Sequence, residues 1–122
     1  MRVLVVDHDK FVRTIYQSEL HQQNITVDLA GDGAEALEMI RKNKPDLVVL
    51  ELVLPRMNGF DFLAELRKDK KLKDIKVLVC TILGQKKDMD EVVSFGVAKY
   101  LRKEDYSHKQ VIEEILNILV AS

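Results

Sequence analysis

Residues 45–51 of this 122-residue chain read Pro-Asp-Leu-Val-Val-Leu-Glu. The four residues Leu47 to Leu50 are all apolar, which is typical of a strand covered on both faces by other elements. Pro45 stops a helix from continuing into this stretch, and Glu51 ends the apolar run. The stretch therefore predicts the central strand of a parallel sheet, with an acidic side chain directly after it.

Similar short apolar runs lie on both sides of this stretch. We expect strands at residues 2–6, 25–29, 47–50, 75–80 and 98–102. Apolar residues recur at helical spacing after each run, which predicts helices over residues 12–20, 33–40, 60–66, 88–95 and 111–119. Strands that alternate with helices pair in parallel through right-handed crossovers. The predicted fold class is α/β, a doubly wound five-stranded parallel sheet built from five β-α units, (βα)5.

The composition predicts one domain that covers residues 1–122. Hydrophobic residues make up 47% of the chain and charged residues 32%, which supplies enough apolar material for one packed core. The formal net charge is -1, so no positive field favours binding to nucleic acid or to an anionic membrane. No apolar stretch reaches the roughly 20 residues that span a bilayer. We expect a cytoplasmic protein in which the single cysteine, Cys80, is a small buried residue.

The predicted helices differ in how clearly they are marked. Two of them start with the spacing of a capping box, in the pairs Asp32 with Glu35 and Ser107 with Gln110. Phe60, Leu63 and Leu66 are predicted to form the apolar stripe of the third helix. The helix over residues 88–95 has a narrow apolar face, so we expect it to be the least stable element.

Chemically active side chains follow four of the predicted strands. In an open parallel sheet, ligands bind beyond the carboxyl ends of the strands. The side chains at those ends are Asp7, His8, Asp9, Glu51, Thr81 and Lys103. Carboxylates suit a hard cation such as Mg2+, while a hydroxyl and an ammonium can hold phosphoryl oxygens. Each residue alone has a structural interpretation, as a backbone acceptor or a solvated charge, but together they indicate phosphoryl chemistry.

Ordered matches to one known family run from Val3 to about Leu119. They include the segments Val5-Val6-Asp7, Pro45 to Leu50 and Leu54-Pro55-Arg56-Met57-Asn58-Gly59. With these segments the chain resembles the receiver domains of two-component response regulators. The resemblance implies a flavodoxin-like fold with strand order 2-1-3-4-5. It also places Thr81 at the family's switch hydroxyl, Tyr100 at its switch aromatic and Lys103 at the lysine that contacts the phosphoryl group.

Three residues depart from the family's pattern at this site, namely His8, Glu51 and Glu104. Glu51 stands at the phosphoacceptor position, where the family has aspartate, and we expect it to be a degenerate acceptor. Its extra methylene moves the carboxylate by about 1.5 Å, and a misplacement of about 1 Å can lower a rate on the order of 100-fold. His8 replaces one acid of the expected Mg2+ site, which leaves Asp7 and Asp9 as a weak metal site. No residue is therefore a confident catalytic residue.

Two functions follow from the resemblance and its departures. The first is a pseudo-receiver, a non-enzymatic module that acts without phosphorylation and without a cofactor. It would bind a protein partner, such as a histidine kinase or an effector domain, through the face that the family uses, here residues 88–95, 98–102 and 111–119. The alternative is an active receiver that accepts a phosphoryl group from a histidine kinase with Mg2+.

Two further points concern the same site. A flavodoxin-like nucleotide or flavin binder is disfavoured, because no glycine-rich loop follows the first strand and Asp7-His8-Asp9 would repel phosphate. Within the pseudo-receiver hypothesis, the longer carboxylate of Glu51 either pairs with Lys103 and imitates the activated state, or only fills the acidic pocket.

Overall fold

Five parallel strands form one sheet in the computed structural model, which describes residues 1–121. The strands are β1 (Arg2–Val6), β2 (Thr26–Ala30), β3 (Leu47–Leu50), β4 (Lys76–Thr81) and β5 (Lys99–Arg102). Their order is β2-β1-β3-β4-β5, so that β3 pairs with β1 on one side and with β4 on the other. The predicted flavodoxin-like fold with strand order 2-1-3-4-5 is confirmed.

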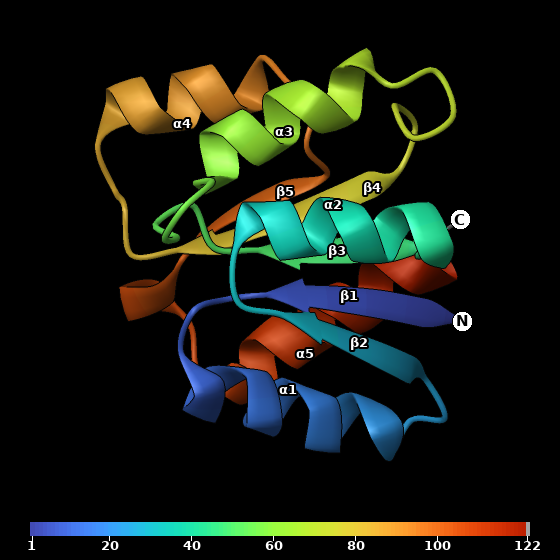
Figure 1. Cartoon of the computed structure of the whole chain (residues 1–122). Coiled ribbons are helices and arrows are strands. Elements are labelled where there is room, and N and C mark those ends of the chain that lie inside the picture. Colours follow the sequence, from blue (N-terminus) through green and yellow to red (C-terminus); the bar gives the residue numbers. More distant parts are fainter. Residues whose placement is uncertain (122) are drawn as a thin grey trace.

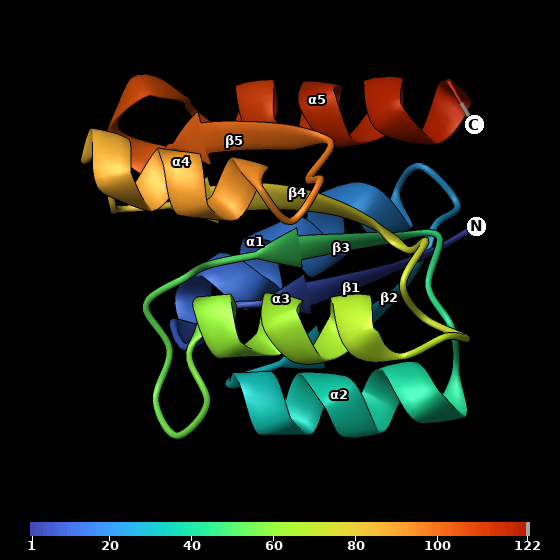
Figure 2. The same ribbon diagram turned by 90° about the horizontal axis from the view of Figure 1, so that it is seen from above.

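Helices cover both faces of the sheet. They are α1 (Lys10–His21), α2 (Gly33–Lys42), α3 (Gly59–Lys68), α4 (Lys86–Val93) and α5 (His108–Val120), with a short 3-10 helix, η1 (Lys103–Asp105). α1 and α5 lie on one face, and α2, α3 and α4 lie on the other (Figure 1). All strands run in one direction (Figure 2), so their carboxyl ends share one edge of the sheet. Among residues 1–121, no helix combines the length and the apolar character needed to cross a membrane.

The central strand β3 packs against both helical layers. Leu47, Val48, Val49 and Leu50 are each at most 2% exposed. Val48 and Leu50 belong to the core under α2 and α3, whereas Leu47 and Val49 belong to the core under α1 and α5. Full burial of one such side chain stabilises the fold by about 1.5–3 kcal/mol. These four residues therefore join the two layers, as their unbroken apolar run predicts.

Cys80 is buried in the layer that α1 and α5 cover. Its thiol lies 3.8 Å from the hydroxyl of Tyr16. Burial raises the pKa of the Cys80 thiol to about 11. The thiol is therefore protonated and shielded at neutral pH, which confirms the prediction of a small buried residue.

The two predicted capping boxes have different outcomes. Ser107 and Gln110 form the complete box at the start of α5. Asp32 caps α2 by accepting the N–H of Glu35, as predicted. The side chain of Glu35, however, accepts the N–H of Gly31 rather than that of Asp32. The predicted hydrogen bond from the N–H of Asp32 to the Glu35 side chain was wrong, because that side chain accepts the N–H of the preceding residue instead.

The helices on the other face correct one detail of the sequence analysis and support another. α3 begins at Gly59 and buries Phe62 with Leu63 and Leu66, whereas Phe60 is only half-buried. The predicted stripe therefore had the wrong phenylalanine. α4 begins at Lys86, buries only Val92 among its residues and lacks a side-chain cap. These features support the expectation that α4 is weakly held.

Candidate functional site

The strands end at one edge of the sheet, where the arrowheads lie in Figures 1 and 2. Asp7 follows β1, Glu51 follows β3, Thr81 ends β4 and Lys103 follows β5. Asp7, Glu51 and Thr81 are each at most 3% exposed. Two carboxylates and a hydroxyl are thus withdrawn from water, which is costly unless each is hydrogen-bonded or paired with a charge.

The Glu51 carboxylate is satisfied entirely by groups around it. Its Oε2 accepts the N–H groups of Leu52 (2.6 Å) and Val53 (3.2 Å), and it also accepts the hydroxyl of Thr81. Its Oε1 accepts the N–H of Ile82 (3.3 Å) and lies 3.1 Å from Lys103 Nζ. Both oxygens are therefore engaged, and the donors come from the segments that follow β3, β4 and β5.

Lys103 supplies the positive charge of the site. Its Nζ lies 2.7 Å from Asp7 Oδ2 and 3.1 Å from Glu51 Oε1, so one ammonium bridges two buried carboxylates. Burial alone would lower the pKa of Lys103. The hydrogen bond to Asp7 and the negative charges of Asp7 and Glu51 outweigh burial, so the pKa of Lys103 is raised above the usual pKa of lysine. The ammonium is therefore fully charged at neutral pH. The ion pair between Glu51 and Lys103, one of the two alternatives that the sequence leaves open, is present.

The two predicted metal ligands, Asp7 and Asp9, accept hydrogen bonds from different parts of the chain. Asp7 Oδ1 accepts the N–H of Asp9 (2.9 Å), while its Oδ2 binds Lys103. The Asp9 side chain caps α1 by accepting the N–H groups of Phe11 (2.8 Å) and Val12. Within residues 1–121, no three His, Cys, Asp or Glu side chains are grouped to hold a metal ion.

His8 and Glu104, the other two departures from the family pattern, lie at the margin of the site. The His8 side chain is mostly exposed, with Nδ1 3.8 Å from Asp7 Oδ1. The Glu104 carboxylate pairs with Arg102, which also pairs with Asp105. Glu104 therefore serves a local ion-pair group beside the site rather than the buried carboxylates.

Tyr100 is linked to the acidic site through the segment after β4. Thr81 Oγ1 accepts the N–H of Leu83 (3.2 Å), and the hydroxyl of Tyr100 donates to the carbonyl of Leu83 (2.7 Å). Burial is the main reason that the pKa of Tyr100 is raised. Glu51, Thr81, Leu83 and Tyr100 thus form one chain of hydrogen bonds that leads from the buried carboxylate to β5.

The structure adds a third buried acid, Asp32, that the sequence analysis treated only as a helix cap. Asp32 is 1% exposed and forms an ion pair with Arg56, which lies in the loop after Glu51. The N–H of Gly33 donates to the carbonyl of Met57 in the same loop (2.9 Å). The loop that carries Leu52 and Val53 is therefore fastened to the start of α2. A left-handed backbone at Arg56 (φ 60°) gives the loop its sharp turn.

Fold and site together define a receiver domain. Residues 3–116 match the response regulator receiver domain family, and the chain belongs to this family. It is a receiver domain of two-component signalling, a class that is typically not enzymatic and that interacts with histidine kinases and effector domains.

Individual relatives show the same relationship. The response regulator MprA of Mycobacterium ulcerans is 37% identical over 103 residues, which are 84% of this chain and 44% of that protein. The chemotaxis protein CheY of Halobacterium salinarum is 29% identical over 120 residues, 98% of each chain. The receiver domain of HemR from Leptospira biflexa has a TM-score of 0.87 at 28% identity, covering 97% of this chain and 93% of that one. This chain spans less than half the length of MprA.

Proposed function

We propose that this chain is a pseudo-receiver, a non-enzymatic protein-interaction module that acts without phosphorylation. The occupied carboxylate of Glu51 is the observation that carries the proposal. Phosphotransfer needs a carboxylate oxygen that is free to attack and aligned with the donor. In this chain one oxygen accepts three donors, and the other contacts the N–H of Ile82 and Lys103. An incoming phosphoryl group would have to displace several of these contacts at once.

The residues at the site do not fit Mg2+ as they lie. Mg2+ requires oxygen ligands in near-octahedral geometry at about 2.0–2.1 Å. The carboxylate oxygens that face each other, Asp7 Oδ2 and Glu51 Oε1, already share the ammonium of Lys103. Asp9 is used as the cap of α1, and the imidazole of His8 is a poor ligand for so hard a cation. A module that works without a cofactor agrees best with this donor set.

The same contacts favour imitation of the activated state over simple filling of the pocket. The resemblance places Thr81 at the switch hydroxyl and Lys103 at the lysine that contacts the phosphoryl group. Here the carboxylate of Glu51 bonds to both Thr81 and Lys103. The hydroxyl of Tyr100 is held by the carbonyl of Leu83, two residues beyond Thr81. We infer that Glu51 holds this chain of hydrogen bonds in one arrangement without any transferred group.

The partner surface in this proposal is the face of α4, β5 and α5, taken over from the family. α4 buries only Val92 and β5 buries only Leu101. Tyr100 on β5 is the last residue of the hydrogen-bond chain that starts at Glu51. The partner would be a histidine kinase or an effector domain, in the cytoplasm. One domain over residues 1–122 stays the prediction for the chain's organisation.

The alternative remains an active receiver that accepts a phosphoryl group with Mg2+. Asp7 and Lys103, which the resemblance places in the phosphotransfer site, are retained and paired. Incubation of the chain with acetyl phosphate and Mg2+, followed by intact-mass measurement, separates the two functions. We expect no added phosphoryl group. Stoichiometric labelling would establish the active receiver instead.

The matched control is Glu51→Asp, which restores the acceptor of the family. Labelling of this variant alone would show that the remainder of the site is competent and that Glu51 is the block. If neither form is labelled, His8→Asp in the Glu51→Asp background tests whether the second acid is required. Labelling of that double variant only would assign the block to both positions.

A further inference from the structure

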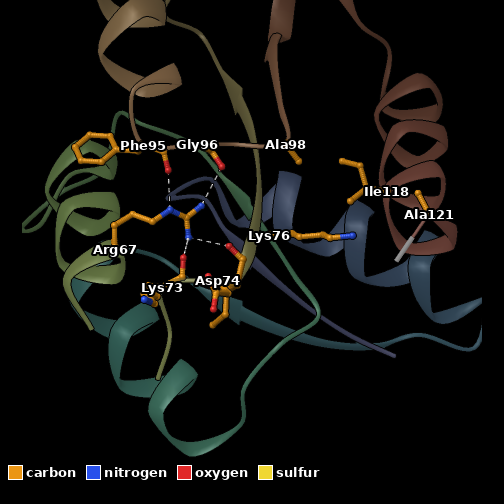
Figure 3. A pocket seen from close by; sticks show the side chains of 10 residues that line it. Arg67, Lys73, Asp74, Lys76, Phe95, Gly96, Ala98, Ile118 and Ala121 are labelled. Atoms are coloured by element: carbon orange, nitrogen blue, oxygen red, sulfur yellow. Dashed lines mark hydrogen bonds between the residues drawn. The ribbon is translucent and has the colours of Figure 1, made fainter. Parts of the chain in front are cut away.

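A hollow lies at the edge of the sheet opposite to the Glu51 site, at the amino ends of β4 and β5. It has a volume of about 540 Å³ and is bordered by the end of α3, the connections before β4 and β5, and the end of α5 (Figure 3). Pockets that hold small organic ligands commonly have volumes of about 300–1,000 Å³. The hollow is therefore large enough for such a molecule, and it is separate from the Glu51 site.

Charged side chains in the hollow are mainly positive. Arg67, Lys73 and Lys76 contribute three cations, and Asp74 is the one acid among the lining residues. Within the described part of the chain, neither Lys73 nor Lys76 has a carboxylate within 4.0 Å. In Figure 3 the Lys76 side chain extends from β4 toward α5. The hollow thus offers two ammonium groups that have no ion-pair partner among residues 1–121.

Arg67 adds a fixed positive charge on the α3 side. Its Nε donates to the carbonyl of Phe95 (2.7 Å), and its Nη1 donates to those of Lys73 (2.9 Å) and Ile75 (2.8 Å). Its Nη2 makes only a long bond to the carbonyl of Gly96 (3.4 Å). Burial lowers the pKa of Arg67, because its charge is partly desolvated, while the negative charge of Asp74 acts in the opposite direction. These bonds hold the guanidinium in place, and Nη2 can still donate a hydrogen bond to a ligand.

Apolar side chains complete the wall on the other side. Ile75, Ala98 and Ile118 line the hollow, and Figure 3 shows the Ile118 side chain extending from α5 toward Ala98. A ligand with a charged end and a compact apolar body therefore matches both kinds of surface. A purely inorganic anion would leave the apolar wall in contact with water.

We propose that this hollow is a binding site for a small organic anion, with its carboxylate or phosphate near Lys76 and Arg67 and its apolar body against Ala98 and Ile118. The site is independent of Glu51 and of the proposed pseudo-receiver function. It lies against Gly96 and Ala98 in the turn that leads into β5, which is the strand that carries Tyr100.

The test is a titration of the whole chain followed by amide NMR, with benzoate and phenyl phosphate as probes. Saturable shifts are expected at Ile75, Gly96 and Ala98, and none are expected at Ile82 beside Glu51. Benzyl alcohol and inorganic phosphate, which each lack one half of the recognised chemistry, should bind more weakly. The stronger of the two organic probes identifies the preferred head group. Shifts that do not saturate, or that lie elsewhere, would overturn the proposal.

Three variants distinguish probe binding in the hollow from non-specific attraction of the anionic probes to any exposed lysine. Lys76→Gln should weaken probe binding about two- to fivefold, the range expected for one exposed charge pair. Lys71→Gln, an exposed lysine outside the hollow, should leave it unchanged. Ala98→Leu places extra volume into the hollow from an exposed position and should abolish saturable binding. Equal weakening by Lys71→Gln and Lys76→Gln, or unchanged binding to a folded Ala98→Leu, would contradict the proposal.

Discussion

The hydroxyl of Thr81 donates a hydrogen bond to Glu51 Oε2, which ties the carboxyl ends of the neighbouring strands β3 and β4 together. The same oxygen of Thr81 accepts the N–H of Leu83. Because both groups are buried, this pair fixes the path of the chain as it leaves β4. The stability of the site therefore depends on a hydroxyl as well as on charges.

Thr81→Val keeps the size of this side chain and removes the hydroxyl. A hydrogen bond to a buried charged group contributes about 1.5–3 kcal/mol, so we expect the free energy of unfolding to fall by that amount in urea denaturation. Thr81→Ser keeps the hydroxyl and removes only a methyl group, which costs about 0.8 kcal/mol. A larger loss for serine than for valine would show that packing, not the hydrogen bond, holds this position.

Lys103→Met removes the cation that Asp7 and Glu51 share. Two buried carboxylates are then left without a counter-charge, and we expect the free energy of unfolding to fall by about 3 kcal/mol or more. Addition of Glu51→Gln to this variant should recover part of the loss, because it removes one of the two carboxylates. The exposed Lys109→Met serves as the control. Additive effects of Glu51→Gln and Lys103→Met would argue against the bridge.

Asp32→Asn tests the third buried acid through the pH dependence of stability. The N–H of Glu35 and the charge of Arg56 hold the pKa of Asp32 below its ordinary value, although burial acts in the opposite direction. A depressed pKa contributes stability above the unfolded-state pKa of about 3.9, and the contribution is lost as the pH falls through the folded-state pKa.

Asparagine also caps helices well, so the variant removes the charge and keeps the cap. The difference in unfolding free energy between wild type and Asp32→Asn should be constant near neutral pH and should shrink below about pH 4. Asp61→Asn, in the first turn of α3, is the control because that residue is not a cap. A difference that does not change with pH would remove the role assigned to the Asp32 charge.

Gly33→Ala tests how tightly the loop after Glu51 is fastened to α2. A Cβ atom on Gly33 would lie 2.6 Å from the carbonyl oxygen of Met57, so the backbone of one segment must move. Overpacking of this kind costs about 1–3 kcal/mol. Gly31→Ala is a matched control, since its nearest contact would be the side chain of Arg13 at 3.4 Å. Equal stability of the two variants in urea would show that the loop yields freely.

Arg67→Met removes the donor that holds the connections before β4 and β5. Three short bonds to carbonyl groups are lost, and we expect a fall in unfolding free energy of about 2–3 kcal/mol. Amide hydrogen exchange around Phe95 and Gly96 should accelerate more than exchange in β1. Arg41→Met, on the exposed end of α2, should have little effect. Unchanged exchange near Phe95 would show that Arg67 does not stabilise the connection before β5.

The sequence predicted the fold well because its strongest signals are local. The run from Leu47 to Leu50 requires cover on both faces, and the alternation of strands and helices leaves few topologies. The predictions were wrong where two neighbouring residues could each fill the same structural role. Both Phe60 and Phe62 are large and apolar, and only the start of α3 at Gly59 decides which of them is buried. The same holds for Glu35, which reaches Gly31 instead of Asp32.

The sequence predicted which side chains share this edge of the sheet, but not which backbone N–H groups donate to Glu51. Asp7, Glu51, Thr81 and Lys103 follow the strands and therefore had to share an edge. Every residue carries an N–H group, so the sequence holds no signal that Leu52, Val53 and Ile82 direct theirs at Glu51. The pairing of Arg56 with Asp32 joins residues 24 positions apart, and it depends on a turn that only the folded chain defines.

The built-in carboxylate of Glu51 has a consequence for timing under the proposed function. A phosphoryl group on a receiver is added and removed, so its signal has a lifetime. A side chain that is part of the polypeptide has none, and a phosphatase has nothing to remove from it. A cell that uses such a module would have to end its message by degrading the protein, diluting it by growth, or competing for its partner.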